Sequence, residues 1–436
     1  MNRFRRGTLF YRFIRPFARI GLGLYFKRII LSNEESLPKE GPVLFAANHP
    51  TAFLEPCILA CFQPRPLHYL VRGDFFKKPF YAFLLKSLHM LPIYRHRDGG
   101  YKSLKNNYST FELCFDALNQ GKALMILAEG RCIHEKRLRP IQKGAARIVL
   151  GALEKYPNLS IPVIPIGVNY TYAERARETV MIDFGEPIMA NDYRALYQES
   201  SQKAINQFTA DLEEAIAKRV VIIEDGADDV LVEQLLQLDR AKRNEKGLEG
   251  STYLKAEKQI ADFVNCLSID QKATLKQESQ AYFGHLEKYQ VRDAEVAKAK
   301  RITHLGALLL GFSPFVIGYI LNFPYHGIAE RIAKVVRRIE FFSPIRWATN
   351  NMLGLIYYLG FFTFAIVLNQ WWLWGLLALA LVTGWWAIHY IDYYRRWKFE
   401  QKWVKLGDKQ KKDLSKQREE LLRKLESMKI EEPKNS

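Results

Sequence analysis

The sequence predicts an α/β fold with a mixed, mostly parallel sheet flanked by helices, followed by a helical annex and a C-terminal transmembrane helical hairpin. Three observations lead to this prediction. The 436 residues exceed the roughly 150 residues of an average domain. Short β-branched runs alternate with helix-like runs between residues 38 and 220, which is typical of parallel or mixed sheets. Three long uncharged apolar runs follow residue 304.

Residues 38–220 form the predicted α/β domain. Its strand-like runs are short and apolar: Pro42–Ala46, Ala123–Leu127, Ile161–Asn169 and Val180–Phe184. The helix-like runs between them are Phe53–Phe62, Leu104–Gln120 and Lys143–Tyr156. Residues 221–300 are rich in Lys and Glu, with a helical period and no strand signal. We therefore expect a charged helical annex there.

The charge balance indicates an anionic partner. Lys and Arg number 64 against 46 Asp and Glu, for a net charge of +18, which suits nucleic acid, a lipid surface or a phosphorylated substrate. Much of this surplus lies beside apolar segments, in residues 1–32 and 331–405. This placement favours anionic lipid over nucleic acid. The five cysteines match no disulfide framework or zinc signature, so we expect a reducing compartment and no metal site.

The apolar runs are Leu305–Leu321, Met352–Leu368 and Trp371–Ile391. The last two approach the roughly 20 residues that cross a bilayer, and Asn369 and Gln370 alone separate them. Residues 351–394 are therefore predicted to form a transmembrane hairpin, with a buried core hairpin as the alternative. Basic residues flank both ends, so we expect the basic tail, residues 395–436, and the preceding domains in the cytoplasm.

The first apolar run differs from the other two. It contains Gly311, Pro314 and Gly318, and both of its flanks are basic. A proline-broken segment with two positive flanks favours a re-entrant or interfacial course, which we predict for residues 301–350 together with a basic linker. A third crossing is the alternative.

Residues 1–37 are predicted to form an amphipathic, membrane-associated helix. Arg12, Arg15 and Arg19 interrupt apolar and aromatic residues at near-helical spacing, and the segment lacks the clean apolar run of a signal peptide. A basic, aromatic helix of this kind lies in the plane of the lipid headgroups. Packing on the domain is the alternative, and the two are compatible.

The first group of candidate site residues follows the strand-like run Pro42–Ala46. Asn48 and His49 come first, Pro50 opens a turn, and Glu55 follows six residues after His49. A histidine that deprotonates a hydroxyl needs a neutral imidazole and a carboxylate that orients it. Glu55 can reach back to His49 if the residues between them form a turn and one helical step. For this pair alone, a structural turn with a solvated glutamate is the alternative.

A second group follows the strand-like run Ala123–Leu127. It consists of Glu129, Gly130, Arg131, Arg137, Arg139 and Lys143. Cations after a strand end, close to the start of the next helix, form an anion site. A solvated basic loop is the alternative.

Two further residues are candidates by position. Arg95 follows the apolar step Pro92–Ile93, and Pro165 lies inside the strand-like run Ile161–Asn169. A proline inside an apolar strand indicates an edge strand or an irregular strand end. Either feature alone is more often structural than functional.

In their order, these blocks resemble the glycerolipid acyltransferase superfamily, which includes glycerol-3-phosphate and 1-acylglycerol-3-phosphate acyltransferases. That family has a His-x4-Asp block preceded by Asn, a block ending in Arg, a Glu-Gly-Thr-Arg block and a Val-Pro-Val-Ile-Pro-like strand. The matching residues are Asn48-His49, Arg95, Glu129-Gly130-Arg131 and Ile161–Pro165. The resemblance covers roughly residues 38–220. This chain departs from the pattern because Glu55 comes one residue later than the usual Asp and no residue separates Gly130 from Arg131.

The resemblance implies a membrane-bound O-acyltransferase. Such an enzyme moves a fatty acyl group from acyl-CoA or acyl carrier protein to a hydroxyl of glycerol-3-phosphate or 1-acylglycerol-3-phosphate, without a cofactor or metal. His49 would be the general base and Glu55 would orient it. The implied substrate-binding residues are Asn48, Arg95, Glu129, Gly130, Arg131, Lys143 and Pro165, with Arg137, Arg139 or Lys143 replacing Arg131 as the alternative phosphate ligand.

Two other functions stay open. The enzyme could acylate another lysolipid or an aminolipid, or the chain could be a non-catalytic lipid-binding membrane protein. In each case the expected partners are membrane lipids and not nucleic acid, and the expected location is the membrane with the α/β domain in the cytoplasm.

Overall fold

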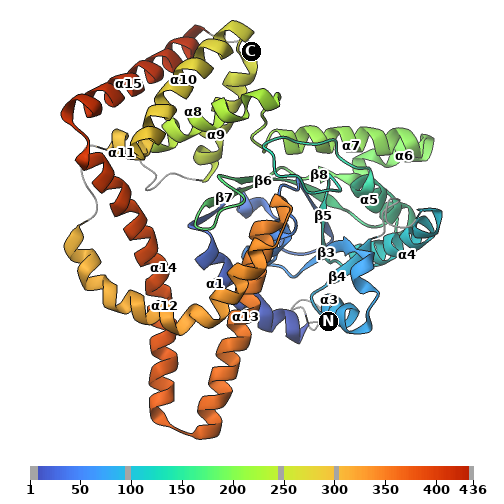
Figure 1. Ribbon diagram of the computed structural model, residues 1–436. Helices are drawn as coiled ribbons and strands as arrows, with labels where there is room; N and C mark the ends of the chain where they lie inside the picture. The colour runs from blue at the N-terminus through green and yellow to red at the C-terminus, as the bar shows by residue number, and fades with distance from the viewer. Residues whose placement is uncertain (1–7, 94–99, 244–249, 299–303, 432–436) are drawn as a thin grey trace. The chain divides into compact units, whose positions relative to one another are not determined.

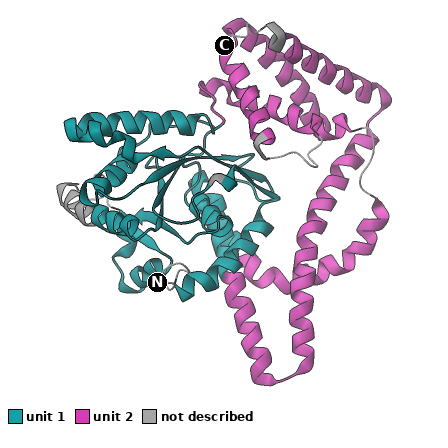
Figure 2. Ribbon diagram, turned by 180° about the vertical axis from the view of Figure 1, so that it is seen from behind, with its two compact units in different colours: residues 1–220, 329–352 teal, residues 221–328, 353–436 magenta. Residues whose placement is uncertain are grey.

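The computed structural model describes residues 8–93, 100–243, 250–298 and 304–431. The chain forms two compact units (Figure 2). Unit 1 comprises residues 1–220 and 329–352, and unit 2 comprises residues 221–328 and 353–436. Each unit therefore contains segments that lie far apart in the sequence.

Unit 1 is built on one sheet of eight strands. In chain order these are β1 (Arg28–Ser32), β2 (Val43–Ala47), β3 (Leu67–Arg72), β4 (Met90–Ile93), β5 (Ala123–Leu127), β6 (Pro162–Tyr170), β7 (Thr179–Phe184) and β8 (Ile188–Met189). Their spatial order is β1-β7-β6-β2-β5-β3-β4, and β8 also pairs with β6. Only the pairs β6–β7 and β6–β8 are antiparallel among these strands. The predicted mixed, mostly parallel sheet is confirmed.

Helices cover both faces of this sheet (Figure 1). They are α1 (Leu9–Tyr25), α2 (Leu54–Phe62), α3 (Pro79–Ser87), α4 (Gly100–Asn119), α5 (Gly144–Lys155), α6 (Arg194–Glu199) and α7 (Ser201–Ala217). Val43, Phe45 and Ala47 share one core with α1 and α2. Leu44 and Ala46 therefore point to the opposite face, where α5 packs. Because β2 is covered on both faces, all five of its residues are apolar and buried.

Helix α1 packs on the domain and also exposes an apolar face. Tyr11, Ala18 and Leu22 are buried, whereas Leu9 is 82% and Ile20 63% exposed. Packing of this helix on the domain is confirmed, and its association with lipid stays a prediction. The helix ends at Tyr25, and β1 follows it. This strand was not predicted from the sequence.

Pro165 was expected to mark an edge strand or an irregular strand end. The first alternative is wrong, because β6 lies inside the sheet between β2 and β7. Pro165 lies between the part of β6 that pairs with β8 and the part that pairs with β7. Val163 pairs with Ile188 of β8, and Ile166 pairs with Phe184 of β7. No ladder partner needs a backbone donor at this junction, so the missing N–H of proline costs nothing there.

Unit 2 contains the predicted helical annex. Its helices are α8 (Asp229–Lys242), α9 (Gly250–Cys266), α10 (Ile269–Tyr289) and α11 (Asp293–Ala297). The C-terminal helix α15 (Asp408–Glu431) packs against α10 and α11. Arg418 of α15 forms a salt bridge of 2.8 Å with the buried carboxylate of Asp293. The tail is thus anchored to the annex.

Three long helices carry the apolar runs. They are α12 (Leu305–Lys334), α13 (Ile339–Leu368) and α14 (Trp371–Lys405), and each is long and apolar enough to cross a membrane. Helices α13 and α14 form the predicted hairpin, with Asn369 in the left-handed conformation at its turn (φ 47°). Only 11% and 22% of their most apolar windows are buried. The alternative of a buried core hairpin is therefore wrong.

Three stacked rings attach α1 to the sheet. The rings of Tyr11 and His89 lie 4.6 Å apart, and those of His89 and His68 lie 4.5 Å apart. Burial, with Lys122 nearby, lowers the pKa of His68 to about 3 and that of His89 to about 4. Both rings are therefore neutral in the folded protein at pH 7.

We expect acidification to destabilise unit 1 through these rings. The unfolded chain takes up both protons near pH 6.5, the ordinary pKa of histidine, whereas the folded chain resists until much lower pH. The stabilisation is therefore complete above about pH 6.5 and declines as the pH falls toward 4. A His68→Phe variant should show a shallower fall of Tm between pH 7 and 5, with His285→Phe in unit 2 as the control. Equal slopes for His68→Phe and wild type would contradict this.

Candidate active site

The candidate site lies where parallel strands end side by side. β2 pairs in parallel with both β5 and β6, so the loops after these strands meet at one edge of the sheet. This edge carries residues 48–53 and 128–143. Both groups of residues singled out in the sequence therefore lie next to each other.

Asn48 ties the loop after β2 to β6. Its Nδ2 donates to the Val168 carbonyl at 2.9 Å, and its Oδ1 accepts from the Val168 N–H at 2.7 Å. Both ends of the amide are engaged with the backbone, and the side chain is buried. Asn48 thus fixes the position of the next residue, His49. Its contact with a substrate stays a prediction.

His49 faces the carboxylate of Glu55. Nδ1 of His49 lies 3.6 Å from Oε2 of Glu55, and their side chains are 7% and 0% exposed. The other carboxylate oxygen, Oε1, accepts from the Thr51 N–H at 2.8 Å and from the Tyr170 hydroxyl at 3.4 Å. The shift of the acidic residue by one position is absorbed because Glu55 stands in the first turn of α2, where its longer side chain reaches back.

Thr51 makes this turn possible. Its hydroxyl accepts from the Leu54 N–H at 3.3 Å, at the start of α2. The backbone N–H of the same residue binds Glu55. The side chain thus binds the N–H of the first residue of α2, and the main chain stabilises the buried carboxylate. Thr51 therefore links the end of the loop to the orientation of Glu55.

Glu129 supports His49 from the neighbouring loop. Its Oε1 accepts from the His49 N–H at 2.8 Å, and the Ile133 N–H donates to the His49 carbonyl at 3.3 Å. Burial raises the pKa of Glu129, while the His49 N–H and the charge of Arg139 oppose that shift. In this structure Glu129 holds the backbone of His49 in place.

Gly130 closes the turn after β5. It adopts the left-handed conformation with φ of 70°, and its N–H donates to the Leu127 carbonyl at 3.1 Å. A residue with a side chain is strained in this region, and its Cβ would also press on Gln142. The turn therefore explains the glycine without a substrate contact.

The basic residues of this loop lie in different environments. Arg131 is exposed, and Lys143 is the exposed N-cap residue of α5, at the helix start as predicted. Arg139 pairs with Glu135 at 2.8 Å, and its charge also acts on Glu129. Arg139 is therefore the cation of this loop whose charge acts on the carboxylate of Glu129, next to His49. Arg95 lies outside the described residues, and Pro165 is a buried strand residue.

The start of α13 also contacts the loop of His49. The Ala52 N–H donates to the Glu340 carbonyl at 3.0 Å, and Ser343 accepts from the Tyr25 hydroxyl at 2.7 Å. Trp347 belongs to the core that α1 and α2 share. Residues 340–347 were predicted to lie in a basic linker, because no local pattern signals a contact across almost 300 positions.

His134 is a second histidine of the loop after β5, and the sequence analysis missed it. Its Nε2 lies 3.2 Å from Oε2 of Glu174, and both side chains are about one quarter exposed, at 25% and 26%. The two residues follow β5 and β6. They form a titratable pair near the end of the sheet that carries His49.

Of the two cysteines of α2, Cys61 is buried and Cys57 is half-buried. Burial raises the pKa of both Cys57 and Cys61 far above that of a free thiol. A neutral thiol is a poor nucleophile and a poor metal ligand. Among the described residues, no group of three or more His, Cys, Asp or Glu side chains could hold a metal ion.

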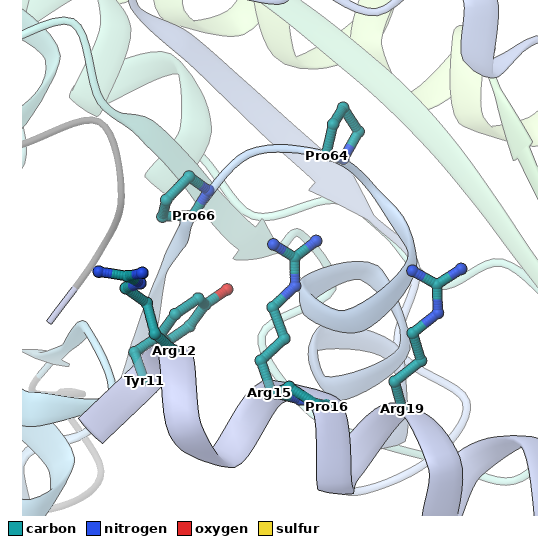
Figure 3. Close-up of a pocket in the computed structure, with 7 residues that line it drawn as sticks. All are labelled: Tyr11, Arg12, Arg15, Pro16, Arg19, Pro64 and Pro66. Carbon is teal, nitrogen blue, oxygen red and sulfur yellow. The ribbon is translucent and has the colours of Figure 1, made fainter. Parts of the chain in front are cut away.

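A groove of about 490 Å³ lies at the other end of α2. Its walls come from α1 and from the loop between α2 and β3, and Figure 3 shows Arg12, Arg15 and Arg19 side by side, facing Pro64 and Pro66. Arg15 donates to the Gln63 carbonyl, and Arg19 stacks over the Phe62 ring. The groove is basic and separate from the loop of His49.

Comparisons with known proteins match the region that contains the site. A sequence model of the Acyltransferase family matches residues 28–169. The chain is 22% identical to glycerol-3-phosphate O-acyltransferase 1 of Saccharomyces cerevisiae over 265 residues, 55% of this chain and 33% of the relative. It is 29% identical to glycerol-3-phosphate O-acyltransferase 2 of the same yeast over 103 residues, 23% of this chain and 14% of the relative. The chain thus spans a third or less of these relatives' length.

One solved structure is also similar. It is the crystal structure of the 1-acyl-sn-glycerophosphate acyltransferase PlsC from Thermotoga maritima, with a TM-score of 0.33 and 14% identity. The similarity covers 46% of this chain and 80% of that chain.

We expect Asn48→Ala to destabilise unit 1. It removes two buried hydrogen bonds to Val168 and leaves one backbone donor and one acceptor without a partner, a loss of about 2 kcal/mol. Thermal unfolding measures this loss. Asn206→Ala, on the exposed face of α7, is the matched control and should leave Tm nearly unchanged. Equal Tm values for the two variants would contradict the positioning role of Asn48.

Proposed function

We propose that this chain, whose residues 28–169 match the Acyltransferase family, is a membrane-bound glycerolipid O-acyltransferase. The family match and the yeast relatives support the resemblance to glycerolipid acyltransferases. It transfers a fatty acyl group from acyl-CoA or acyl carrier protein to a hydroxyl of glycerol-3-phosphate or 1-acylglycerol-3-phosphate. The names of the yeast relatives support the glycerol-phosphate acceptor. The three apolar helices support the membrane location.

The observation that carries this proposal is the buried pair of His49 and Glu55. A carboxylate beside Nδ1 favours the tautomer with the proton on Nδ1, which leaves Nε2 as a base. In the proposed reaction, Nε2 takes the proton of the acceptor hydroxyl while the oxygen attacks the thioester carbonyl. The C–S bond then breaks, and the thiolate takes the proton from the imidazolium. Glu55 stabilises the positive ring between these steps.

The substrate phosphate is proposed to bind the cations of the loop after β5. Arg139 is our first candidate, since its charge already acts on Glu129, and Lys143 stands at the N-terminus of α5, where the helix dipole favours an anion. A guanidinium binds phosphate with two parallel hydrogen bonds. The exposed Arg131 is a weaker candidate.

Helix α1 is proposed to lie at the lipid surface. Its exposed apolar side chains are Leu9, Phe10, Phe13, Phe17 and Ile20. Arg12, Arg15 and Arg19 of the same helix line the groove shown in Figure 3, and cations beside an apolar helix face suit phosphate headgroups. This arrangement supports a catalytic domain on the cytoplasmic surface, where the acidic leaflet attracts it.

We expect His49→Ala to lower kcat by at least about a hundredfold, because the general base is lost. Glu55→Gln keeps the length of the side chain but removes its charge, and should lower kcat by a similar order with little change in KM. Steady-state kinetics in detergent measure both effects, with His285→Ala as the control. Full activity of His49→Ala would contradict the enzymatic proposal and favour a non-catalytic lipid-binding protein.

An acceptor screen tests the substrate. Radiolabelled acyl-CoA or acyl carrier protein is supplied with glycerol-3-phosphate, 1-acylglycerol-3-phosphate, other lysolipids and an aminolipid. We expect labelled product from one of the two phosphate monoesters. Labelling of another lysolipid or the aminolipid alone would reject the proposed acceptor while leaving the enzyme class intact.

The phosphate site is tested by the Arg139→Gln variant. Since one charge-assisted pair is lost, we expect KM for the phosphate acceptor to rise about tenfold, with a smaller change in kcat. Arg131→Gln is the matched control and should have little effect. A larger rise in KM for Arg131→Gln than for Arg139→Gln would contradict this proposal and identify Arg131 as the phosphate ligand.

A further inference from the structure

The number of membrane crossings follows from which segments pack together. Three helices, α12, α13 and α14, are long and apolar enough to cross a bilayer. Three crossings would place the residues before α12 and those after α14 on opposite sides of the membrane. Two crossings, or none, would place them on the same side.

Unit 2 requires the same side. Residues 221–298 precede α12, and α15 follows α14. Arg418 of α15 pairs with Asp293 of α11 at 2.8 Å, and Lys242 of α8 pairs with Glu426 of α15 at 2.8 Å. Residues in contact share a compartment. The number of crossings between residues 298 and 408 is therefore even.

Unit 1 identifies α12 as the helix that does not cross. The end of α12 and the start of α13, residues 329–352, pack with residues 1–220. Residues 221–298 follow residues 1–220 without a break in the chain, and the described part of residues 221–298 contains no helix apolar enough to span a membrane. These two segments therefore lie on the same side of the bilayer. The residues on the two sides of α12 therefore lie on the same side of the bilayer.

The contacts of α12 with α14 show that it descends into the apolar region. Leu308 and Gly311 accept hydrogen bonds from Tyr390 and Trp386, close to the end of the apolar run at Ile391. Farther along, Gly318 lies directly against the backbone of Thr383, and Asn322 donates to the Ala380 carbonyl at 3.1 Å. From Leu308 to Asn322, the residue of α14 that α12 contacts changes from Tyr390 to Ala380. These ten residues span about 15 Å along α14, which is half of the roughly 30 Å hydrocarbon core.

The contacts with α13 show that α12 then returns. Asn322 accepts from the Tyr358 hydroxyl at 2.6 Å, and the Tyr357 hydroxyl donates to the Leu321 carbonyl at 2.9 Å. Eight residues after Asn322, Glu330 pairs with Arg346 in unit 1. Arg346 precedes Tyr358 by about three helical turns, or about 18 Å. The end of α12 therefore contacts the start of α13, whereas its middle contacts α13 farther along the chain.

Pro324 stands at the turning point between these two sets of contacts. A proline inside a helix lacks an N–H and clashes with the carbonyl four residues earlier, so it bends the helix. Figure 1 shows α12 as a bent helix. The hydrogen bonds of Tyr357 and Asn322 satisfy polar groups beside the bend, which an apolar environment requires.

We propose that α12 is a re-entrant helix that enters the lipid from the side of the catalytic unit, reaches about the middle of the bilayer near Asn322, and returns to the same side. The lipid that α12 contacts is the leaflet on the side of the catalytic unit. The side chains that face lipid include Leu309, Leu310, Phe312, Ile320 and Phe323, all between 47% and 85% exposed. Only α13 and α14 then cross the membrane.

Single cysteines at three positions test the sidedness. His304→Cys precedes α12, Val335→Cys follows it, and Gln370→Cys lies at the tip of the hairpin. Each is made in a chain with Cys266→Ser, which removes an exposed thiol, and the parent chain gives the background. We expect a membrane-impermeant maleimide to label positions 304 and 335 from one side of sealed vesicles and position 370 from the other.

Two outcomes of this labelling would overturn the proposal. Labelling of positions 304 and 335 from opposite sides would mean that α12 spans the bilayer. Labelling of all three positions from one side would mean that the hairpin does not cross.

The depth of α12 is tested with spin labels at three exposed positions. Leu310 and Ile328 lie toward the ends of α12, and Ile320 lies near the bend. Oxygen, which concentrates in lipid, and a water-soluble nickel chelate relax the labels to different extents with depth. We expect Ile320 to be the deepest of the three. Equal depths would indicate a helix flat on the surface and contradict the re-entrant course.

Discussion

Two carboxylates inside unit 1, those of Glu55 and Glu129, determine how the loop between β2 and α2 folds. They are 0% and 6% exposed, and a buried carboxylate is costly unless donors surround it. The N–H groups of Thr51 and His49 supply those donors. The loop is therefore folded around two buried carboxylates. Glu55 lies 3.6 Å from the imidazole of His49, and Glu129 binds the backbone N–H of the same residue.

This arrangement depends on segments that are remote in sequence. Asn48 joins the loop to β6, and the carbonyl of Glu340 accepts from the Ala52 N–H at the other end of the loop. Glu340 lies in the first turn of α13, whose apolar part forms one arm of the hairpin. A helix that is long and apolar enough to cross a membrane is thus also part of the support for His49. This fits the proposed function, because the acyl groups and product of a glycerolipid acyltransferase reside in the membrane.

The sequence was sufficient for the elements that are buried on both faces. The strands β2, β5, β6 and β7 appear as continuous apolar runs, and they were predicted within about two residues. The strand β3 was missed because half of its residues are only partly buried, and β1 because it follows an amphipathic helix. The pairing of His49 with Glu55 could be predicted, since only six residues, a turn and the start of α2, separate them. The contacts of Asn48 with Val168 and of Ala52 with Glu340 could not, because long-range pairs have no local signature.

The protonation of His49 tests the account most directly. If Glu55 orients the ring, ¹⁵N NMR of the histidine-labelled protein, assigned with a His49→Gln variant, should show that the neutral ring carries its proton on Nδ1 and none on Nε2. That state makes Nε2 available to an acceptor hydroxyl. A neutral ring with its proton on Nε2 instead would contradict the account, because Nδ1 would then face the carboxylate without a proton and Nε2 could not serve as the base.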